Sequence, residues 1–346
     1  MPATVIGNTQ LTLLDWAKRK DPDGKIARVI NLLGQSNEIL EDMLWEQGNL
    51  PTGNRTTVVT GLPGVTRRIL NRGVAPTKPT TDQLDDAAEI LEAWCVVDQK
   101  IADLNGASAE FLLAQAKMYL EAMNQTFVQD LFYADTTVNS ERMMGFTPRY
   151  ASLTGVNGQN ILNAGGTGSN NTSVWLVGWG ENAVTGIFPK GSTAGLIHEN
   201  YGVETVQDTA QDTNGISGSV LRAYRSRFEW TCGLAVKDWR YGVRLANIDI
   251  PDLIGNTGTQ GAQQLIKLMS RMQDRVPNTM AVRLAYYCNR TVASILKVQA
   301  LDKSQNAISI VDAISQFGGV KGKQMEFLGI PVRRCDQLLA TESLVS

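Results

Sequence analysis

The sequence is poor in the residues that most often carry chemistry. Of its 346 residues, one is a histidine and four are cysteines. The cysteines lie far apart, at Cys95, Cys232, Cys288 and Cys335. No pair of them has the spacing of a metal-ligand motif, and nothing implies a disulfide framework. A reducing compartment is therefore the simplest expectation.

Long apolar runs and a signal sequence are also missing. No run approaches the ~18 apolar residues of a membrane span. The first residues, "MPATVIGNTQLTLLDWAKRK", lack a basic start, an apolar core and a small-residue cleavage site. The net charge of −2 excludes binding to nucleic acid through bulk positive charge. With 43% hydrophobic and 19% charged residues, the chain is typical of a globular protein of one large or two ordinary domains.

Each candidate for a catalytic or ligand site has a simpler structural reading. His198 has no nucleophile or carboxylate at motif spacing. The stretch "AGGTGSN" lacks the Gly-Lys-Ser/Thr ending of a phosphate loop and precedes a strand rather than a helix. The turns "DPDG" and "DIPD" do not complete a calcium loop. Trp175 and Trp179 alternate on a strand, which favours a packed sheet face over a sugar platform. We therefore predict no enzymatic activity, no cofactor and no metal site.

The charges are unevenly distributed along the chain. Residues 51–80 contain five basic residues and no acid, whereas residues 81–98 contain six acids and no base. We interpret 51–80 as two short β-prone runs joined by the Gly-Leu-Pro-Gly turn, with little apolar content for a core of its own. The opposed blocks fit either a solvated surface or an interface in which the basic hairpin of one copy meets an acidic face of another. The predicted hairpin contacts are Arg55, Val59, Leu62, Arg67, Arg68 and Arg72, and the predicted acidic face is Asp82, Asp85, Asp86, Glu89 and Glu92.

Periodicity predicts the main elements. Short amphipathic helical pieces are expected over residues 8–46, and one long helix over about 107–133, where apolar residues recur at i+3 or i+4. A long β-stretch over 219–250 is expected to turn near Cys232-Gly233. In the last hundred residues, a helix, a strand, a helix capped by Asn289 and a final strand predict a compact α+β subdomain near 250–325.

This order of parts resembles the major capsid proteins of tailed bacteriophages, which have the Hong Kong 97 coat fold. "LPTGNRTTVVTGLPGVTRRILNRGV" looks like the extended loop of short-tailed phage coats, "AMNQTFVQDLFY" like the end of their spine helix, and "DWRYGVRLANID" like a strand of their peripheral domain. The resemblance implies an α+β fold in five parts. They are an N-terminal arm (1–50), an extended β-hairpin loop (51–84), a peripheral domain (85–248) with the spine helix and a polar insertion at about 186–218, an axial domain (249–324) and a C-terminal strand (325–346) that returns to the peripheral domain.

The resemblance also implies the function and the partners. The chain would form hexamers and pentamers that close into an icosahedral head around double-stranded DNA, with weak, non-specific DNA contact and no membrane. A separate scaffolding protein, a portal at one vertex and a decoration protein are the other expected partners, and the virion would be assembled in the bacterial host cytoplasm. Covalent crosslinking is not expected, because Lys78 lies at the hairpin base rather than at its tip. Two alternatives stay open: an encapsulin-like nanocompartment shell, and a soluble carbohydrate-binding or enzymatic β-rich protein.

Overall fold

The computed structural model describes residues 37–104, 108–207, 220–255, 262–301, 308–313 and 322–346. The described chain divides into two compact units. Of the described residues, unit 1 contains those of 90–127 and 195–231, and unit 2 contains those of 35–89, 128–194 and 232–346. Most of the expected N-terminal arm lies outside the described residues. These units divide the chain differently from the expected domains, since residues 249–324 share unit 2 with residues 128–194.

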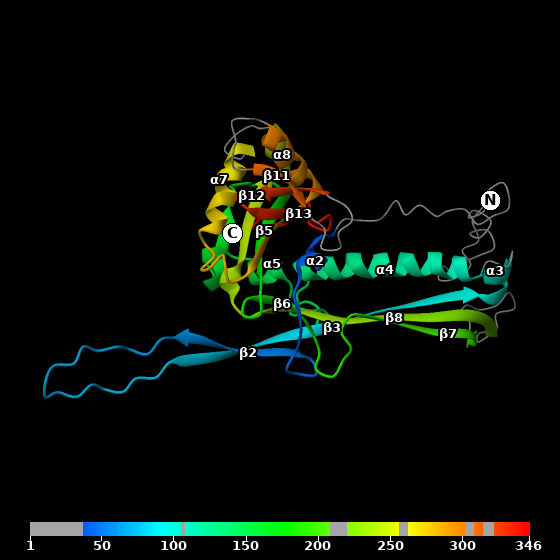
Figure 1. Ribbon diagram of the computed structural model, residues 1–346, viewed down its shortest axis with the longest axis horizontal. Coiled ribbons are helices and arrows are strands. Elements are labelled where there is room, and N and C mark those ends of the chain that lie inside the picture. The colour runs from blue at the N-terminus through cyan, green and yellow to red at the C-terminus, as the bar shows by residue number, and fades with distance from the viewer. Residues whose placement is uncertain (1–36, 105–107, 208–219, 256–261, 302–307, 314–321) are drawn as a thin grey trace. The chain divides into compact units, whose positions relative to one another are not determined.

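Unit 1 is a helix packed on one face of an antiparallel sheet (Figure 1). Its elements are β3 (Thr80–Asp98), α3 (Gln99–Asp103), α4 (Ser108–Tyr133), β7 (Leu196–Gln207) and β8 (Val220–Val236). In the sheet, β8 pairs with β7 and also lies next to β3. Cys95 and Val97 of β3 pack against Phe111 and Met123 of α4, so one sheet face forms the core of this unit.

Helix α4 confirms the long predicted helix. Its 26 residues correspond to about 39 Å at 1.5 Å per residue. Phe127 and Leu131, which belong to its predicted apolar face, are fully buried. The boundary between the units falls after Phe127, so both units use residues of this one helix.

Unit 2 is built on a mixed sheet. The strand order is β11-β12-β13-β10-β5-β6-β8-β3-β2, in which β8 and β3 contribute the portions that lie in this unit. Strand β9 pairs with β5 and β4, and β1 pairs with β6. The bounds are β1 (Trp45–Gln47), β2 (Gly53–Gly61), β4 (Ile161–Asn163), β5 (Asn171–Trp179), β6 (Val184–Phe188), β9 (Gly242–Asp249), β10 (Arg283–Cys288), β11 (Ile308–Ala313), β12 (Gly322–Phe327) and β13 (Ile330–Arg334). Every residue of β5 is buried, which makes this strand the centre of the unit.

Helices cover the core of unit 2. They are α6 (Ile250–Gly255), α7 (Ala262–Gln273) and α8 (Arg290–Leu301), and the shorter turns are α2 (Ile39–Asp42), α5 (Phe146–Arg149), η2 (Val156–Asn160) and η3 (Trp239–Tyr241). Met269 and Met272 of α7 are fully buried in this core, as the predicted amphipathic pattern requires. The predicted cap of α8 is confirmed, because the Asn289 side chain accepts a hydrogen bond from the Val292 N–H at 2.9 Å. No helix of the described ranges is long and apolar enough to span a membrane.

The predicted turn at Cys232-Gly233 is wrong. Strand β8 continues through both residues, and the chain turns later, at η3. A Cβ atom on Gly233 would lie 2.9 Å from the carbonyl oxygen of Ala87 and 3.0 Å from the Cα of Ala88. The glycine therefore allows β3 and β8 to approach closely and does not mark a turn.

Other local predictions also need correction. The described part of the polar segment 186–218 includes the twelve-residue strand β7, which is part of the sheet because it pairs with β8 along its length. The helical spacing near residue 40 predicts a helix, but only the four-residue helix α2 forms there, and it is followed by strand β1. The predicted final strand is a hairpin of β12 and β13, since Leu328 and Gly329 both adopt positive φ angles, of 48° and 81°.

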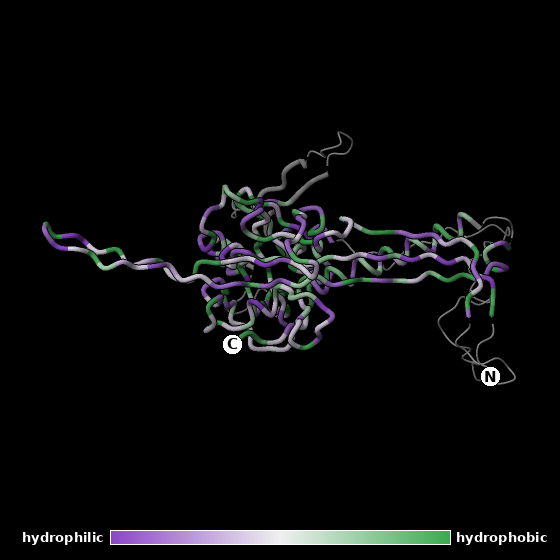
Figure 2. Tube along the Cα trace, turned by 90° about the horizontal axis from the view of Figure 1, so that it is seen from below, coloured by the Kyte–Doolittle hydropathy of each residue, from purple (hydrophilic) through white to green (hydrophobic). Residues whose placement is uncertain are grey.

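The predicted hairpin exists, but its strands are arranged differently. Strand β2 pairs with the acidic β3, from Gly53 opposite Ala87 to Gly61 opposite Thr80. The Gly-Leu-Pro-Gly stretch does not close the hairpin, and the chain turns at 69–72, where the Arg72 N–H donates to the Ile69 carbonyl. One ion pair, Arg55 with Asp85, crosses directly between the two paired strands. Figure 2 shows hydrophilic and hydrophobic stretches following one another along the hairpin.

Candidate functional site

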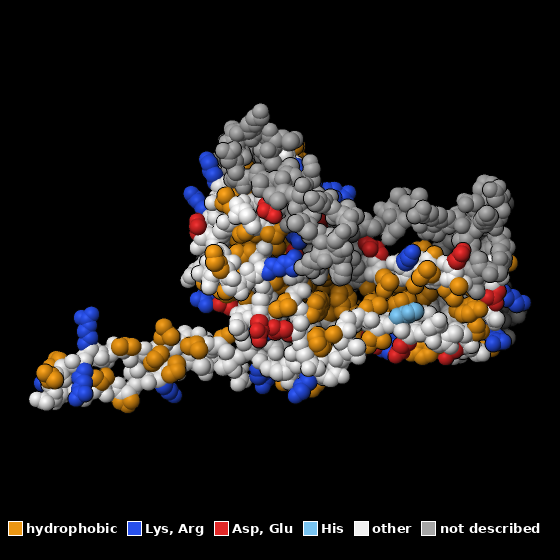
Figure 3. Space-filling view, in the orientation of Figure 1, with side chains coloured by type: hydrophobic (Ala, Val, Ile, Leu, Met, Phe, Trp, Pro, Cys, Tyr) orange, Lys and Arg blue, Asp and Glu red, His pale blue; other side chains and the backbone are white. Residues whose placement is uncertain are grey.

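Residues 62–79, here called the hairpin tip, are the most exposed part of the described chain. All of them are exposed, and they include four apolar side chains with little or no cover: Leu62 (88% exposed), Val65 (96%), Ile69 (70%) and Leu70 (90%). Figure 3 shows hydrophobic and cationic side chains interleaved along the tip. Complete burial of one such side chain is worth about 1.5–3 kcal/mol. Several large apolar side chains exposed within one short segment indicate an interaction site.

The tip is also positively charged throughout. It contains Arg67, Arg68, Arg72 and Lys78 and no acidic residue. None of these four cations forms an ion pair with a described carboxylate. The Arg68 guanidinium instead donates to the Arg72 carbonyl at 3.1 Å, which tightens the turn. The tip thus offers unpaired cations as well as apolar side chains.

The root of the hairpin, in contrast, is firmly held. Arg55 on β2 forms a bidentate pair with Asp85 on β3, with both N–O distances 2.6 Å, and this hydrogen bonding lowers the pKa of Asp85. Asp86 is buried and accepts from the Arg149 guanidinium at 2.6 Å and from the Val236 N–H at 3.2 Å. Burial nevertheless raises the pKa of Asp86, since desolvation outweighs the attraction of Arg149.

A second buried carboxyl lies at the same root. Glu89 accepts a hydrogen bond from the Met143 N–H at 3.1 Å through one oxygen, and the other oxygen is buried without a hydrogen-bond partner. Burial raises its pKa to about 7, and the charge of Asp130 adds to the rise. Asp130 is paired with Arg142 at 3.2 Å, but burial raises the pKa of Asp130 as well. The root thus contains a carboxyl that titrates near neutral pH.

The five carboxylates predicted as an acidic face do not form one surface. Asp86 and Glu89 are buried at the root, so the prediction that they are exposed is wrong. Asp85 is exposed but paired with Arg55 of the same hairpin. Asp82 is exposed at the hairpin, and Glu92 belongs to unit 1, where it pairs with Arg227. Side chains alternate between the two faces of a strand, which is why a contiguous acidic run does not make a contiguous acidic surface.

Most of the residues predicted as hairpin contacts are exposed, as a contact with another copy requires. Val59, Leu62 and the three arginines of the tip are exposed, while Arg55 is part of the root pair. Their role as contacts between copies stays a prediction.

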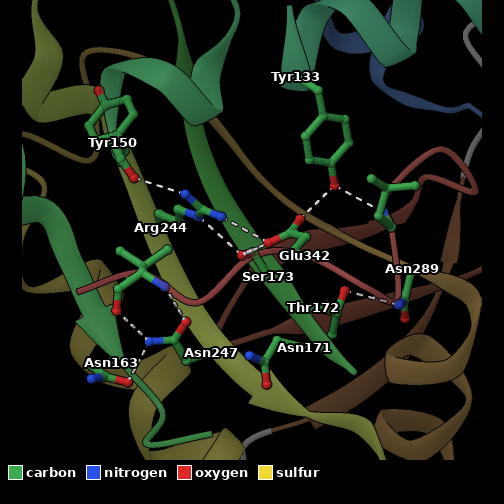
Figure 4. A network of polar contacts seen from close by, with 12 residues as sticks. Tyr133, Tyr150, Asn163, Asn171, Thr172, Ser173, Arg244, Asn247, Asn289 and Glu342 are labelled. Atoms are coloured by element: carbon green, nitrogen blue, oxygen red, sulfur yellow. Dashed lines mark hydrogen bonds and ion pairs between the residues drawn. The ribbon is translucent and has the colours of Figure 1, made fainter. Parts of the chain in front are cut away.

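A buried polar network, not anticipated from the sequence, anchors the C-terminal segment to the core of unit 2 (Figure 4). Arg244 of β9 pairs with Glu342 at 2.9 Å, and both side chains are at least 96% buried. The Arg244 guanidinium also donates to the Ser173 hydroxyl at 3.0 Å and to the Tyr150 carbonyl at 2.9 Å. The other oxygen of Glu342 accepts from the Tyr133 hydroxyl at 2.5 Å.

The last residues are fixed by further hydrogen bonds. The Asn247 side chain donates to the Val345 carbonyl at 2.8 Å and accepts from the Val345 N–H at 2.9 Å. The Glu342 N–H donates to the Asn171 carbonyl at 2.8 Å. The C-terminal segment is therefore an internal part of unit 2, held mainly by side chains of β5 and β9.

A third anchor holds the segment that follows the undescribed N-terminal residues. Asp42 is fully buried and contacts Arg283 at 2.7 Å, Arg333 at 3.1 Å and the Tyr287 hydroxyl at 3.0 Å. The Tyr287 hydroxyl accepts in turn from the Trp179 indole at 2.8 Å. These contacts join α2 to β10 and β13, so the chain enters unit 2 at a fixed point.

The residues considered for chemistry have structural roles in the described chain. His198 is exposed on β7 and stacks on Phe228 at a centroid distance of 4.6 Å. All four cysteines are buried and unpaired. Trp175 and Trp179 are buried in the sheet of unit 2, as expected for a packed face. The described residues contain no group of three or more His, Cys, Asp or Glu side chains that could hold a metal ion.

Comparison with known proteins identifies this architecture. Residues 21–346 match the family model described as major capsid protein GP7. The chain belongs to this family of major capsid proteins. It is also similar to a solved structure of bacteriophage Epsilon15, with 31% identity, 99% of each chain covered and a TM-score of 0.74. The predicted resemblance to tailed-phage capsid proteins with the α+β Hong Kong 97 fold is thus confirmed, and the chain is a structural component of an icosahedral phage capsid.

More distant solved structures show lower similarity. The capsid of bacteriophage JBD30 matches with 10% identity over 89% of this chain and 92% of that chain, at a TM-score of 0.45. An encapsulin complex from Synechococcus elongatus matches with 12% identity over 68% and 96%, at a TM-score of 0.42. Comparison with curated proteins gives no match.

Proposed function

We propose that this capsid protein forms the hexamers and pentamers of a phage head that encloses double-stranded DNA, and that the hairpin tip of each copy lies on a neighbouring copy. One observation carries this proposal: a chain that assembles into a shell presents a tip whose large apolar side chains are exposed and whose cations pair with no described carboxylate. An isolated pair of strands gains little stability from itself. Contact with a neighbour supplies the missing burial.

A head-to-tail contact of this kind has a geometric consequence. The tip and the surface that receives it are different parts of the chain, so the contact is heterologous and closes into rings of fixed rotation. Rings of five and six copies then follow from small changes in the angle at this contact. A net charge of −2 suits a container that does not hold its DNA tightly, because tight binding to phosphates needs many unpaired cations.

The remaining partners belong to the same proposal. They are a separate scaffolding protein during assembly, a portal at one vertex and a decoration protein, with assembly in the bacterial cytoplasm. We assign no enzymatic activity to the chain and propose that mature particles contain no covalent crosslinks, since Lys78 lies near the Thr80 end of the tip rather than at its turn. A boiled and reduced gel of mature particles should show a single monomer band, and a ladder would contradict this part.

The role of the tip can be tested by removing its apolar surface. In the variant Leu62→Asp/Val65→Asp/Leu70→Asp, the unassembled subunit should keep its unfolding temperature, since all three side chains are exposed. Shells, scored by sedimentation and negative-stain microscopy with candidate scaffold present, should be absent. A matched control is Val138→Asp/Met280→Asp, which changes exposed apolar residues (85% and 96%) outside the hairpin. Normal shells from the tip variant would refute the proposed role.

A further inference from the structure

Residues 142–145, here called the latch segment, lie directly against the C-terminal end of α4. The Arg142 guanidinium pairs with Asp130 of this helix at 3.2 Å. The Gly145 N–H donates to the Ala134 carbonyl at 2.9 Å. A Cβ atom on Gly145 would lie 2.7 Å from the carbonyl oxygen of Asp130, so only glycine fits there. The latch segment is therefore closely fitted to the end of the helix.

The latch segment also contacts β3 in two ways. The Met143 N–H donates to the Glu89 side chain of this strand at 3.1 Å. The Met144 carbonyl accepts from the Arg149 guanidinium at 3.1 Å. The same guanidinium pairs with Asp86 of β3 at 2.6 Å. Because β3 is the second strand of the hairpin, these contacts connect the latch segment to the hairpin root.

Glu89 occupies a position where the strand pattern places apolar side chains. Side chains alternate along β3, and Leu91 and Cys95 belong to the core formed with α4, so Glu89 points to the same side. Its side chain is only 3% exposed, and one of its two oxygens is buried without a hydrogen-bond partner. An ionised carboxylate in this position has neither water nor a full set of donors, which makes its charge costly.

The charges that face Glu89 from the surrounding elements do not balance. Asp130 of α4 is buried, and it pairs with the half-exposed Arg142 of the latch segment. The buried Cys232 of β8 lies close enough for the charges of both carboxyls to raise the pKa of its thiol. The ion pair between Arg149 and β3 is already matched. Among the described residues at this site, two carboxyls therefore share one guanidinium, and one proton completes a neutral group.

Glu89 is the group that takes up this proton near neutral pH. Burial raises the pKa of Glu89 to about 7 and the charge of Asp130 adds to the rise, while the Met143 N–H and Arg142 oppose it. Burial raises the pKa of Asp130 as well, but its own ion pair with Arg142 opposes the rise. The Cys232 thiol stays neutral, because burial raises its pKa further.

We propose that the latch segment is a proton-controlled device, which stays closed on α4 and β3 while Glu89 carries a proton and opens when that carboxyl ionises and reaches water. Opening breaks one of the two contacts with β3 and so loosens the hairpin root. This inference goes beyond the proposed function and does not depend on it, since it concerns the unassembled subunit. Glu89, Asp130, Cys232 and the latch segment all belong to unit 2.

The size of the effect follows from the proton balance. In the open segment Glu89 meets water and has its ordinary pKa of 4.5, whereas its pKa in the closed segment is about 7. Between these pH values, opening releases a proton, so the opening constant rises about tenfold per pH unit and levels off above about pH 7. From pH 5.5 to pH 8 the expected rise is about 30-fold.

Hydrogen exchange of the unassembled subunit, followed by mass spectrometry of its peptides, measures this opening. The Met143 amide loses its acceptor when the latch segment opens. The reference is the Val345 amide, which donates to the Asn247 side chain, an acceptor that does not titrate. Relative to this reference, which corrects for the pH dependence of exchange itself, the rate at Met143 should rise about 30-fold from pH 5.5 to pH 8.

A matched pair of variants identifies the titrating group. Glu89→Gln removes the charge but keeps an oxygen that can accept from the Met143 N–H, so the rate ratio should no longer depend on pH. Glu141→Gln, at an exposed carboxylate next to the latch segment, should keep the rise of the wild type.

Two results would overturn the proposal. A wild-type ratio that does not change with pH would show that the latch segment does not respond to a proton, whether or not Glu89→Gln folds. A full rise that persists in Glu89→Gln would show that another group, such as Asp130, is the one that titrates. Neither measurement involves shells, so either result would leave the proposed function standing.

Discussion

Replacing Glu342 with alanine removes one partner of the buried pair that anchors the C-terminal segment. Arg244 would keep its hydrogen bonds to Ser173 and to the Tyr150 carbonyl but would lose its only described carboxylate, at a position where it is 98% buried. Ser173 and the Tyr133 hydroxyl would each lose an acceptor as well. Removing one partner of a buried ion pair destabilises a protein by about 3–5 kcal/mol, because an uncompensated charge stays behind.

The size of the effect can be checked on the unassembled subunit. An unfolding entropy of about 2.1 cal/mol/K per residue gives roughly 0.7 kcal/mol/K for 346 residues, so the unfolding midpoint should fall by roughly 4–7 °C. Denaturant unfolding measures the free energy directly. The matched control Glu141→Ala, at an exposed carboxylate, should change the unfolding free energy by less than about 0.5 kcal/mol.

A second variant separates charge from packing. In Arg244→Met/Glu342→Leu both charges are replaced by apolar groups of similar size, and much of the lost stability should return, since well-packed apolar residues often replace a buried pair without loss. A loss below about 1 kcal/mol for Glu342→Ala would refute the reasoning, because it would mean that Arg244 is not left as an unpaired buried charge.

Three further predictions concern unit 2. Glu89→Gln should raise the unfolding free energy at pH 8 by about 3 kcal/mol and leave it nearly unchanged at pH 4. The pKa of Glu89 is raised from 4.5 to about 7 in the folded state, so between these pH values the folded state holds a proton that the unfolded state has lost. The stability of the wild type therefore falls as the pH rises from about 4.5 to 7. Equal effects at both values would contradict this. Gly233→Ala should destabilise the subunit by about 1–3 kcal/mol, whereas Gly73→Ala, whose Cβ would meet no atom within 4 Å, should be neutral in the same urea titration. Asp42→Ala should destabilise by about 1–3 kcal/mol, because the buried Tyr287 hydroxyl loses its acceptor and Arg333 keeps only Glu38, at 3.6 Å. A midpoint shift no larger than that of Glu41→Ala would disprove this role.

Local sequence patterns predicted correctly those elements whose structure depends mainly on residues close in the sequence. The apolar spacing of α4, the cap at Asn289 and the strand at β5 each depend on neighbours within a few residues, and each prediction was confirmed. The charge blocks correctly indicated an unusual hairpin. They did not reveal that the acidic block is its second strand, because strand pairing is a long-range choice.

Contacts between distant residues could not be predicted in the same way. Arg244 and Glu342 are 98 positions apart, and neither has a local pattern that marks it as buried. Gly233 was predicted to lie in a turn, but it is required by the close approach of the β3 backbone. The β3 residues concerned lie about 145 positions earlier in the chain, so no local pattern marks this contact.

The hairpin combines a rigid root with a tip that has no partners of its own, and the two properties depend on each other. A flexible root would let the tip sample many directions. Binding to a neighbour would then cost the conformational entropy lost when the whole hairpin becomes ordered. Asp86, bonded to Arg149 and to the backbone of β8, restricts that freedom before any neighbour is present. In the proposed contact between copies, the apolar side chains of the tip, which are exposed in one copy, can therefore contribute most of their burial energy.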